Sequence, residues 1–255
     1  MAENKGDGKK IFLLYPQSVI QQDMLDILIM AGYETYIIFD TDRARKLLKK
    51  FPGSIMYINI DERFKEPEWE AYIRNIIKDE ETKDSMLGIM SYNQDKALMK
   101  KYLMDLAIHC GYVQLKLGIK ESTKIIIGAL EANEARGKRK FIRADCEDDV
   151  NATISIKLNV GSGYNTGKLL DISSAGIAVK FDKFENIAPN SIIADIQLRL
   201  RTGLIRTDMI YMGKRMDLEN VYILLFDQKM SQDNKFIVYR YVKSCLQKYI
   251  DTLQI

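Results

Sequence analysis

The sequence holds a single histidine, three cysteines and four prolines among 255 residues. Metal sites and hydrolytic centres need several histidine, cysteine or carboxylate groups at suitable spacing, and no such cluster occurs. His109 and Cys110 are adjacent in a predicted helix, so their side chains do not share a face. Cys146 and Cys245 lie far from Cys110 and from each other, which favours reduced thiols on small buried side chains. We therefore expect neither an enzyme nor a bound metal.

Long apolar runs are also missing. No segment approaches the ~20 apolar residues that a membrane-spanning helix needs. The chain opens on a polar stretch instead of a signal peptide, and we expect residues 1–9 to form a disordered leader. The net charge is only +3, so any basic function has to be local. These features predict a cytoplasmic protein without membrane insertion.

Residues 10–135 alternate between short apolar segments and segments with helical spacing. This pattern is typical of βαβ units, which form a parallel sheet with helices on both faces. Thr41 is expected to cap the second helix. The expected strands are 11–15, 33–39, 55–60, 86–90 and 113–117, and the expected helices are 17–30, 42–50, 66–78, 95–109 and 122–135.

Five such units resemble the receiver domain of two-component systems, which has a flavodoxin-like fold. Asp61 is near the expected phospho-acceptor position, Ser91 follows the fourth strand and Lys116 lies on the fifth. The stretch Tyr15-Pro16-Gln17 stands where receivers carry an acidic pair. Without that pair nothing holds the Mg²⁺ on which phosphoryl transfer depends. We therefore predict a degenerate receiver-like module retained for interaction, with Asp61 a solvated carboxylate.

The pattern changes after Gly137. Many short strands follow one another without helices between them, which predicts a small antiparallel β-barrel, and a helical pattern returns near the end. We expect a receiver-like domain at 10–135, a basic linker at 136–143 and a barrel domain with a C-terminal helix at 144–255. The expected elements are strands at 151–158, 168–172, 176–181, 191–200, 204–212 and 221–226, a loop at 161–167 and a helix at 234–250.

Two short motifs carry the chemistry of this second half. The first is Arg139-x-x-x-Arg143, within a stretch that has five Lys or Arg in eight residues. Two guanidinium groups can grip phosphates bidentately or stack on a base. The second is Asp171-x-Ser173-x-x-Gly176, in which a carboxylate can accept from the N–H edge of guanine. Together these residues suit a guanine nucleotide with more than one phosphate.

The two motifs in this order resemble the signature of PilZ domains, which are bacterial receptors for cyclic di-GMP. The resemblance covers residues 136–250. It implies that Arg139 and Arg143 contact the phosphates and the Hoogsteen edge of guanine from a flexible approach to the barrel. It also implies a linker that becomes ordered over the ligand, and motility among the processes that such a receptor regulates.

On the barrel side, the resemblance implies that Asp171 and Ser173 bind a second guanine edge, and that Gly176 leaves room for the base. Lys138 stands at the position that is associated with one bound ligand or an intercalated pair. Lys keeps the charge but lacks the planar fork of Arg, so the number of ligands stays open. The sequence does not identify the downstream protein partner.

Other interpretations compete with this one. The basic stretch 136–143 is compatible with nucleic-acid binding, although no recognition-helix motif or aromatic-rich sheet accompanies it. A degenerate response-regulator-type interaction protein is a further alternative. On purely structural grounds, the basic stretch could be a solvated linker and DxSxxG a capped turn.

Overall fold

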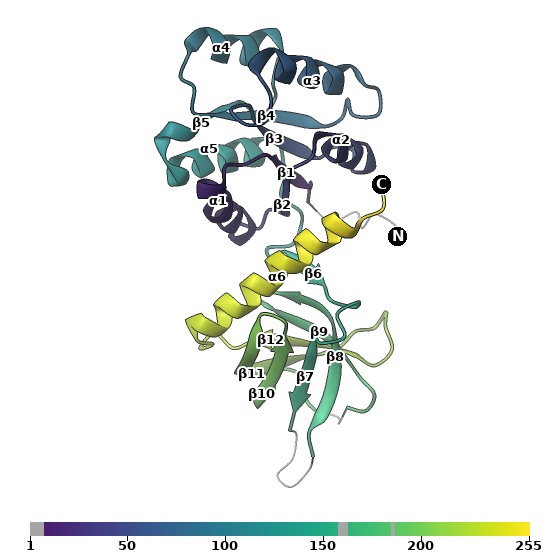
Figure 1. Cartoon of the computed structure of the whole chain (residues 1–255). Coiled ribbons are helices and arrows are strands. Elements are labelled where there is room, and N and C mark those ends of the chain that lie inside the picture. Colours follow the sequence, from purple (N-terminus) through teal and green to yellow (C-terminus); the bar gives the residue numbers. More distant parts are fainter. Residues whose placement is uncertain (1–7, 158–162, 185–186) are drawn as a thin grey trace. The chain divides into compact units, whose positions relative to one another are not determined.

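The computed structural model describes residues 8–157, 163–184 and 187–255. The chain divides into two compact units (Figure 1). The first unit runs up to Lys140 and includes Thr252–Ile255, and the second unit is Phe141–Asp251.

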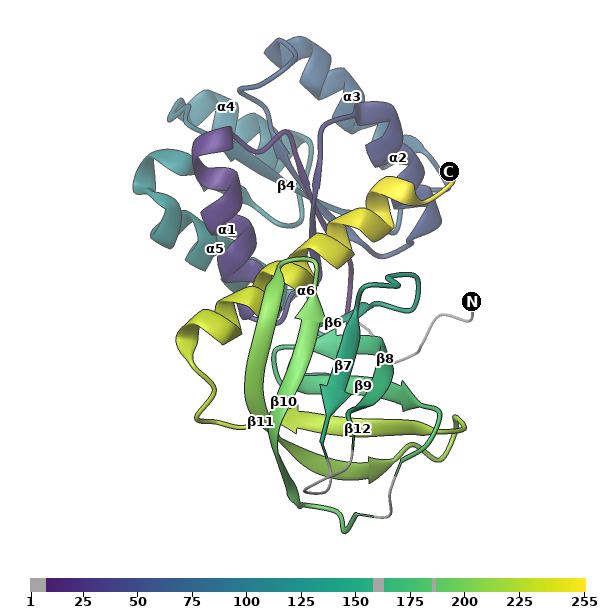
Figure 2. The ribbon, with the colours of Figure 1, turned by 60° about the horizontal axis from the view of Figure 1, so that its bottom comes forward.

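The first unit is built on a parallel five-stranded sheet in the order β2-β1-β3-β4-β5. Helices α1 and α5 cover one face, and α2 and α3 lie on the other (Figures 1 and 2). The predicted receiver-like α/β fold is confirmed. The strands are β1 (Ile11–Leu14), β2 (Thr35–Ile38), β3 (Ile55–Asn59), β4 (Met86–Ser91) and β5 (Tyr112–Gln114); the helices are α1 (Ser18–Met30), α2 (Thr41–Lys50), α3 (Glu66–Lys78), α4 (Lys96–Lys100) and α5 (Ile119–Ala132).

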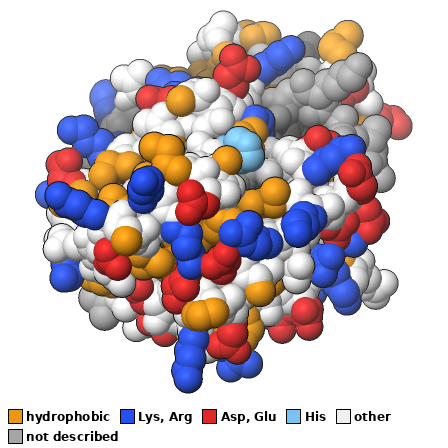
Figure 3. Space-filling view, turned by 90° about the horizontal axis from the view of Figure 1, so that it is seen from above, with side chains coloured by type: hydrophobic (Ala, Val, Ile, Leu, Met, Phe, Trp, Pro, Cys, Tyr) orange, Lys and Arg blue, Asp and Glu red, His pale blue; other side chains and the backbone are white. Residues whose placement is uncertain are grey.

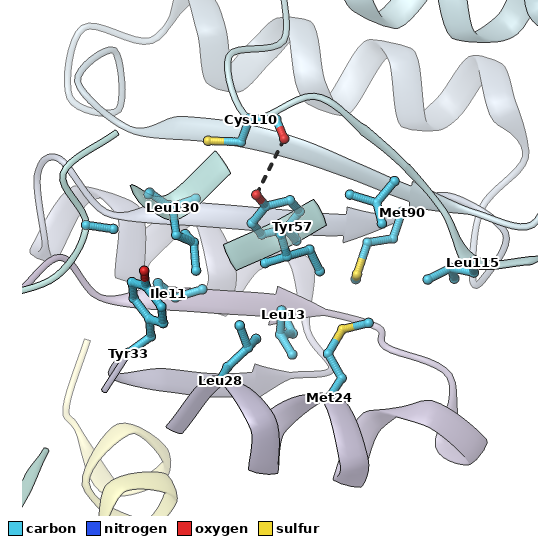
Figure 4. Close-up of a cluster of buried hydrophobic side chains, with 14 residues drawn as sticks. Ile11, Leu13, Met24, Leu28, Tyr33, Tyr57, Met90, Cys110, Leu115 and Leu130 are labelled. Carbon is cyan, nitrogen blue, oxygen red and sulfur yellow. Dashed lines mark hydrogen bonds between the residues drawn. The ribbon is translucent and has the colours of Figure 1, made fainter. Parts of the chain in front are cut away.

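One hydrophobic cluster of this unit lies between the sheet and the helices α1 and α5 (Figure 4). Leu13 and Leu28 are fully buried there, and the Tyr57 hydroxyl donates to the carbonyl oxygen of Cys110 at 3.4 Å. Cys110 is one of three buried free cysteines, as the sequence predicts for each of them. Continuous apolar strands produce this core because a parallel sheet is buried on both faces.

Three local predictions for the first unit are wrong. Asp40, not Thr41, caps α2, because its carboxylate accepts from the Arg43 amide at 2.6 Å. The helix expected up to His109 ends earlier, in a π-helical turn (η1, Lys101–Asp105), and His109 lies in the following turn. Strand β5 also stops short, so Lys116 is in a 3₁₀ turn (η2, Leu115–Leu117).

The second unit is an antiparallel barrel with a C-terminal helix, as predicted (Figure 2). Six strands form the closed ring β8-β7-β10-β11-β12-β9, which the β8–β9 pairing closes, and β6 extends the sheet from β8. The elements are β6 (Arg143–Asp145), β7 (Thr153–Ile156), β8 (Asn165–Ser173), β9 (Gly176–Phe181), β10 (Ile192–Leu200), β11 (Gly203–Lys214), β12 (Val221–Phe226) and α6 (Gln232–Thr252).

Helix α6 is tied to the barrel unit through two polar contacts one turn apart on its inner face. Tyr241 donates its hydroxyl proton to the Asp149 carboxylate at 2.8 Å, and the Thr202 hydroxyl donates to the carbonyl oxygen of Ile237 at 3.0 Å. Val238 and Val242 are buried beside them. The apolar side of this helix, which the sequence assigns either to the barrel or to a partner, therefore contacts the barrel.

Two segments were expected to be irregular, the leader 1–9 and the loop 161–167. Residues 1–7 of the expected leader lie outside the described residues, and the amide of Lys9 donates to the carbonyl oxygen of Ala135 at 2.9 Å. Within the expected loop 161–167, residues 161 and 162 also lie outside the described part. Asn165–Gly167 were wrongly assigned to that loop, because they pair with β7 as the start of β8.

Candidate ligand-binding site

The short strand β6 brings the two motifs of the second unit together. Arg143 pairs with Ser173, and Asp145 pairs with Asp171. Residues paired across strands point to the same face, and so do residues two apart, so all four side chains share one face. The Arg143 Nη1 atom lies 3.9 Å from Asp171 Oδ1. Arg143 was expected in a flexible approach to the barrel; instead, ladder hydrogen bonds to β8 hold its backbone.

A β-bulge in β8 directs Asp171 out of the barrel. The register with β9 shifts between Leu169, which pairs with Val179, and Asp171, which pairs with Ala178. Without the extra residue, Asp171 would share the inward face of Leu169, since strand side chains alternate with a period of two. With it, Leu169 and Ile172 are both fully buried and the Asp171 carboxylate reaches the surface, with a side-chain exposure of 23%.

A second arginine, which directly follows β11, approaches Asp171. The Arg215 Nη1 atom lies 3.8 Å from Asp171 Oδ2, and Arg215 also forms a bidentate pair with Asp217, at 2.9 and 2.5 Å. Hydrogen bonding to Asp217 raises the pKa of the Arg215 guanidinium, and the same pairing lowers the pKa of the Asp217 carboxyl. Asp171 is thus flanked by two guanidinium groups, one at each oxygen.

Ser173 and Gly176 build the turn that joins β8 to β9. The Ser173 hydroxyl donates to the carbonyl oxygen of Gly176 at 3.3 Å and accepts from the Ala175 amide at 3.2 Å. A Cβ on Gly176 would lie 2.3 Å from the Leu224 carbonyl oxygen. The backbone of β12 therefore requires this glycine, whereas the sequence-based expectation assigned the space to a base. Ser173 and Gly176 therefore form a side-chain-capped turn, which is the purely structural interpretation of the DxSxxG motif.

Lys138 and Arg139 stand before the boundary of the two units, which falls between Lys140 and Phe141, so the RxxxR motif spans that boundary. Arg136, at the start of the basic stretch 136–143 that contains both residues, is held by contacts with the first unit. Arg136 donates to the Ala31 carbonyl oxygen at 2.9 Å, and its guanidinium lies 5.1 Å from the centre of the Tyr33 ring. Arg136 is therefore a packing residue of the first unit.

The receiver-like residues of the first unit also meet, at the carboxyl ends of β3 and β4. The Asp61 carboxylate accepts from the Ser91 hydroxyl and from the Tyr92 amide, both at 2.6 Å. Asp61 is exposed, as expected of a solvated carboxylate at a strand end, and it also bridges the ends of two strands. Asn59 donates to the Tyr15 carbonyl oxygen at 3.0 Å, which ties β3 to the segment that replaces the acidic pair.

Within the part of the chain that the structure describes, no group of three or more His, Cys, Asp or Glu side chains could hold a metal ion. His109 is exposed, and Figure 3 shows a histidine side chain on a face where Lys or Arg and Asp or Glu side chains are interspersed. Among the described residues, no helix is both long and apolar enough to cross a membrane.

No protein-family model matches the sequence, and no curated protein matches it significantly. Solved structures do show similarity. The PilZ domain of YcgR from Escherichia coli with c-di-GMP has 15% identity and a TM-score of 0.37, over 46% of this chain and 99% of that one. The MrkH–c-di-GMP complex of K. pneumonia has 15% identity and a TM-score of 0.33, over 42% of this chain and 51% of that one, so the similarity spans about half of MrkH.

A signal receiver domain is also similar to part of the chain. The receiver domain of an HD domain-containing protein from Pseudomonas fluorescens Pf-5 has 17% identity and a TM-score of 0.40. The match covers 49% of this chain and 97% of that one. The chain is thus similar in structure both to PilZ proteins and to a receiver domain.

Arg215 is not among the site residues that the sequence predicts. Its only local signal is the pair Arg215-x-Asp217 after a strand, which is common on protein surfaces. Nothing in the sequence links it to Asp171, because the two residues approach each other only when the barrel closes.

Proposed function

We propose that this protein is a non-enzymatic receptor for cyclic di-GMP. The observation that carries the proposal is the β6–β8 pairing, which places Arg143 beside Asp171 with 3.9 Å between Nη1 and Oδ1. Residues from two motifs far apart in the sequence share one face, and their chemistry is complementary to one guanine nucleotide.

Arg143 supplies the cationic part of the site. Its guanidinium is a planar donor that fits either a phosphate or the O6 and N7 acceptors of guanine. The side chain is 44% exposed, so it can exchange its long contact with Asp171 for a ligand without a large desolvation cost. Because β6 already fixes the backbone of Arg143, less conformational entropy is lost when the ligand binds.

Asp171 supplies an acceptor that selects for guanine. A carboxylate accepts from both the N1–H and the N2 amino group of guanine, and each charge-assisted hydrogen bond contributes about 1.5–3 kcal/mol. Adenine presents an acceptor at N1 and is disfavoured at the same position. The bulge that turns Asp171 outward is consistent with this role, because bulges often re-aim side chains at binding sites.

Lys138 and Arg139 complete the proposed ligand contacts from the other side of the unit boundary. Because the RxxxR motif spans that boundary, a ligand that engages Arg139 and Arg143 together couples the two units. Ligand binding then shifts the equilibrium between arrangements of the two units, by as much as the ligand's affinity differs between them. A protein partner recognises the arrangement that the ligand favours. Whether one or two ligands bind is decided by measured stoichiometry.

The test is calorimetric titration of cyclic di-GMP into the full chain, at low and at high salt. Arg143→Ala should weaken binding by about 10- to 100-fold, which corresponds to the loss of one or more charge-assisted hydrogen bonds. The matched control is Arg199→Ala, which removes an exposed arginine from β10 and should leave affinity unchanged. Absence of wild-type binding would refute the proposal.

The salt series addresses the nucleic-acid alternative. A nucleotide held by base contacts loses little affinity with salt, whereas binding by phosphate neutralisation alone falls steeply. A single-stranded DNA oligomer titrated in parallel should bind weakly, with a steep salt dependence. Tight DNA binding by a chain that ignores cyclic di-GMP would favour the alternative.

A further inference from the structure

The face formed by β6 and β8 carries two opposed carboxylates. Asp145 stands directly opposite Asp171, and like charges in that position destabilise a strand pair. Arg143 approaches Oδ1 of Asp171 at 3.9 Å, and Arg215 approaches Oδ2 at 3.8 Å. Two cations therefore balance this acidic pair, and the sequence motif accounts for only one of them.

Arg215 is held more firmly than an ordinary surface arginine. Its amide donates to the Val221 carbonyl oxygen at 2.8 Å, just beyond the β11–β12 ladder. Its guanidinium forms the bidentate pair with Asp217 through Nε and Nη2, which leaves Nη1 as the atom nearest Asp171. The side chain is 32% exposed. Because Asp217 fixes one edge of the planar guanidinium group, the opposite edge, with Nη1, points in a defined direction.

A bulge gives Arg215 this direction, as another does for Asp171. The register of β11 with β12 shifts between Tyr211 and Gly213, so Met212 is an extra residue. Without it, Arg215 would continue the face of Met209 and Tyr211, which are buried. The extra residue reverses the alternation, and Arg215 meets Asp171 on the outer side of the barrel.

We propose that Arg215 is a positioning residue that holds the Asp171 carboxylate toward a guanine base while Arg143 contacts the ligand. This inference rests on the proposed function. When Arg143 turns to the ligand, Asp171 loses one of its two cations and still faces Asp145. Arg215 then balances the charge of Asp171 and keeps one of its oxygens oriented. Loss of Arg215 should weaken the preference for guanine as well as the affinity.

The test uses the full chain titrated with cyclic di-GMP and, as the adenine analogue, cyclic di-AMP. Arg215→Ala should weaken cyclic di-GMP binding about tenfold, within the range of coupling between residues of one charge network. It should also reduce the affinity ratio of cyclic di-GMP over cyclic di-AMP. Arg206→Ala is the matched control, because it removes the same charge from the same hairpin, at an exposed ion pair with Asp195. It should change affinity less than about twofold.

A double variant tests whether Arg215 acts through Asp171. Asp171→Ala/Arg215→Ala should bind no more weakly than Asp171→Ala alone, because Arg215 then has nothing to position. Additive losses would overturn the positioning role. Arg215→Lys, which keeps the charge and loses the fork, should restore part of the affinity, and Asp217→Asn should cause a smaller loss than Arg215→Ala. These two milder variants decide the question if Arg215→Ala does not fold.

The outcomes separate this inference from the proposed function. If the wild type binds, Arg143→Ala binds more weakly as expected, and Arg215→Ala behaves like Arg206→Ala, only the role of Arg215 is refuted. If the folded wild type binds neither dinucleotide, the receptor function fails, and the role of Arg215 fails with it.

Discussion

Gly176 and the Leu224 carbonyl oxygen approach each other so closely that a Cβ on the glycine would lie 2.3 Å from that oxygen. The contact is between the backbones of β9 and β12, which are neighbouring, hydrogen-bonded strands that cannot move apart easily. The last residue of the DxSxxG motif is thus required by strand packing, which has a direct experimental consequence.

We expect Gly176→Ala to lower the free energy of unfolding by more than about 2 kcal/mol, because overpacking against backbone forces the strands apart. Urea unfolding followed by far-ultraviolet circular dichroism measures this. Gly163→Ala is the matched control, since a Cβ there meets nothing within 4 Å. Equal stability of the two variants would contradict the packing argument, and cyclic di-GMP titration would then test Gly176 as a ligand residue.

The bridge from Asp61 to β4 predicts a structural effect. Asp61→Ala removes two acceptors of hydrogen bonds, those from Ser91 and Tyr92, and should cost about 1–3 kcal/mol of stability. Fluorescence of Trp69, the single tryptophan, reports unfolding of this unit. Asp105→Ala, an exposed acidic residue of the same unit, is expected to be neutral.

The same carboxylate should not accept a phosphoryl group, because Tyr15-Pro16-Gln17 offers no acidic pair for Mg²⁺. Incubation with acetyl phosphate and Mg²⁺, followed by intact-mass measurement, should leave the mass unchanged. A phosphoryl adduct on Asp61 would show that the unit has kept receiver chemistry.

The cap of α2 distinguishes two adjacent residues. Asp40→Ala should destabilise the first unit by about 1 kcal/mol, because the Arg43 amide loses its acceptor. Thr41→Ala should have a smaller effect, since the contact of Thr41 with Tyr72 uses the backbone carbonyl oxygen. Thermal unfolding of both variants decides the order, and a larger loss for Thr41→Ala would reverse the assignment.

Cys110 predicts a dependence of stability on pH. Burial raises the pKa of this thiol from 9.0 to about 11. The unfolded chain therefore binds fewer protons than the folded chain between these values, and stability falls as the pH rises through that window. Cys110→Ala should make the fall between about pH 9 and pH 11 smaller, by roughly 2 kcal/mol. Identical pH profiles for variant and wild type would show that the thiol does not ionise in this range.

Much of the architecture was predictable because it depends on local patterns. Apolar segments of strand length alternate with helical spacing in the first unit, and this repeat predicts a parallel sheet. The bounds of α3, β9 and β12 agree with the prediction because turn-forming residues or caps flank each of them. The prediction of a helix up to His109 was wrong because α4 ends in a π-helical turn. This turn contains the buried Tyr102, and hydrophobic periodicity does not reveal it.

The candidate site was predictable only in part. The sequence alone predicts the residue types of the site and their order, Arg143, Asp171 and Ser173. It also predicts that the first two are complementary to guanine. Which face each side chain takes is decided by two β-bulges, since one extra residue reverses the alternation of a whole strand. A bulge has no reliable sequence signal.

The sequence by itself determined the two-part organisation, the strand and helix composition and the chemical groups available for a guanine ligand. Only the tertiary structure decided that Arg215 stands beside Asp171, that Ser173 and Gly176 build a turn and that Asp61 bridges two strands. The physical reason is that these relationships join residues distant in sequence, and their distances depend on sheet register and barrel closure, which no local pattern records.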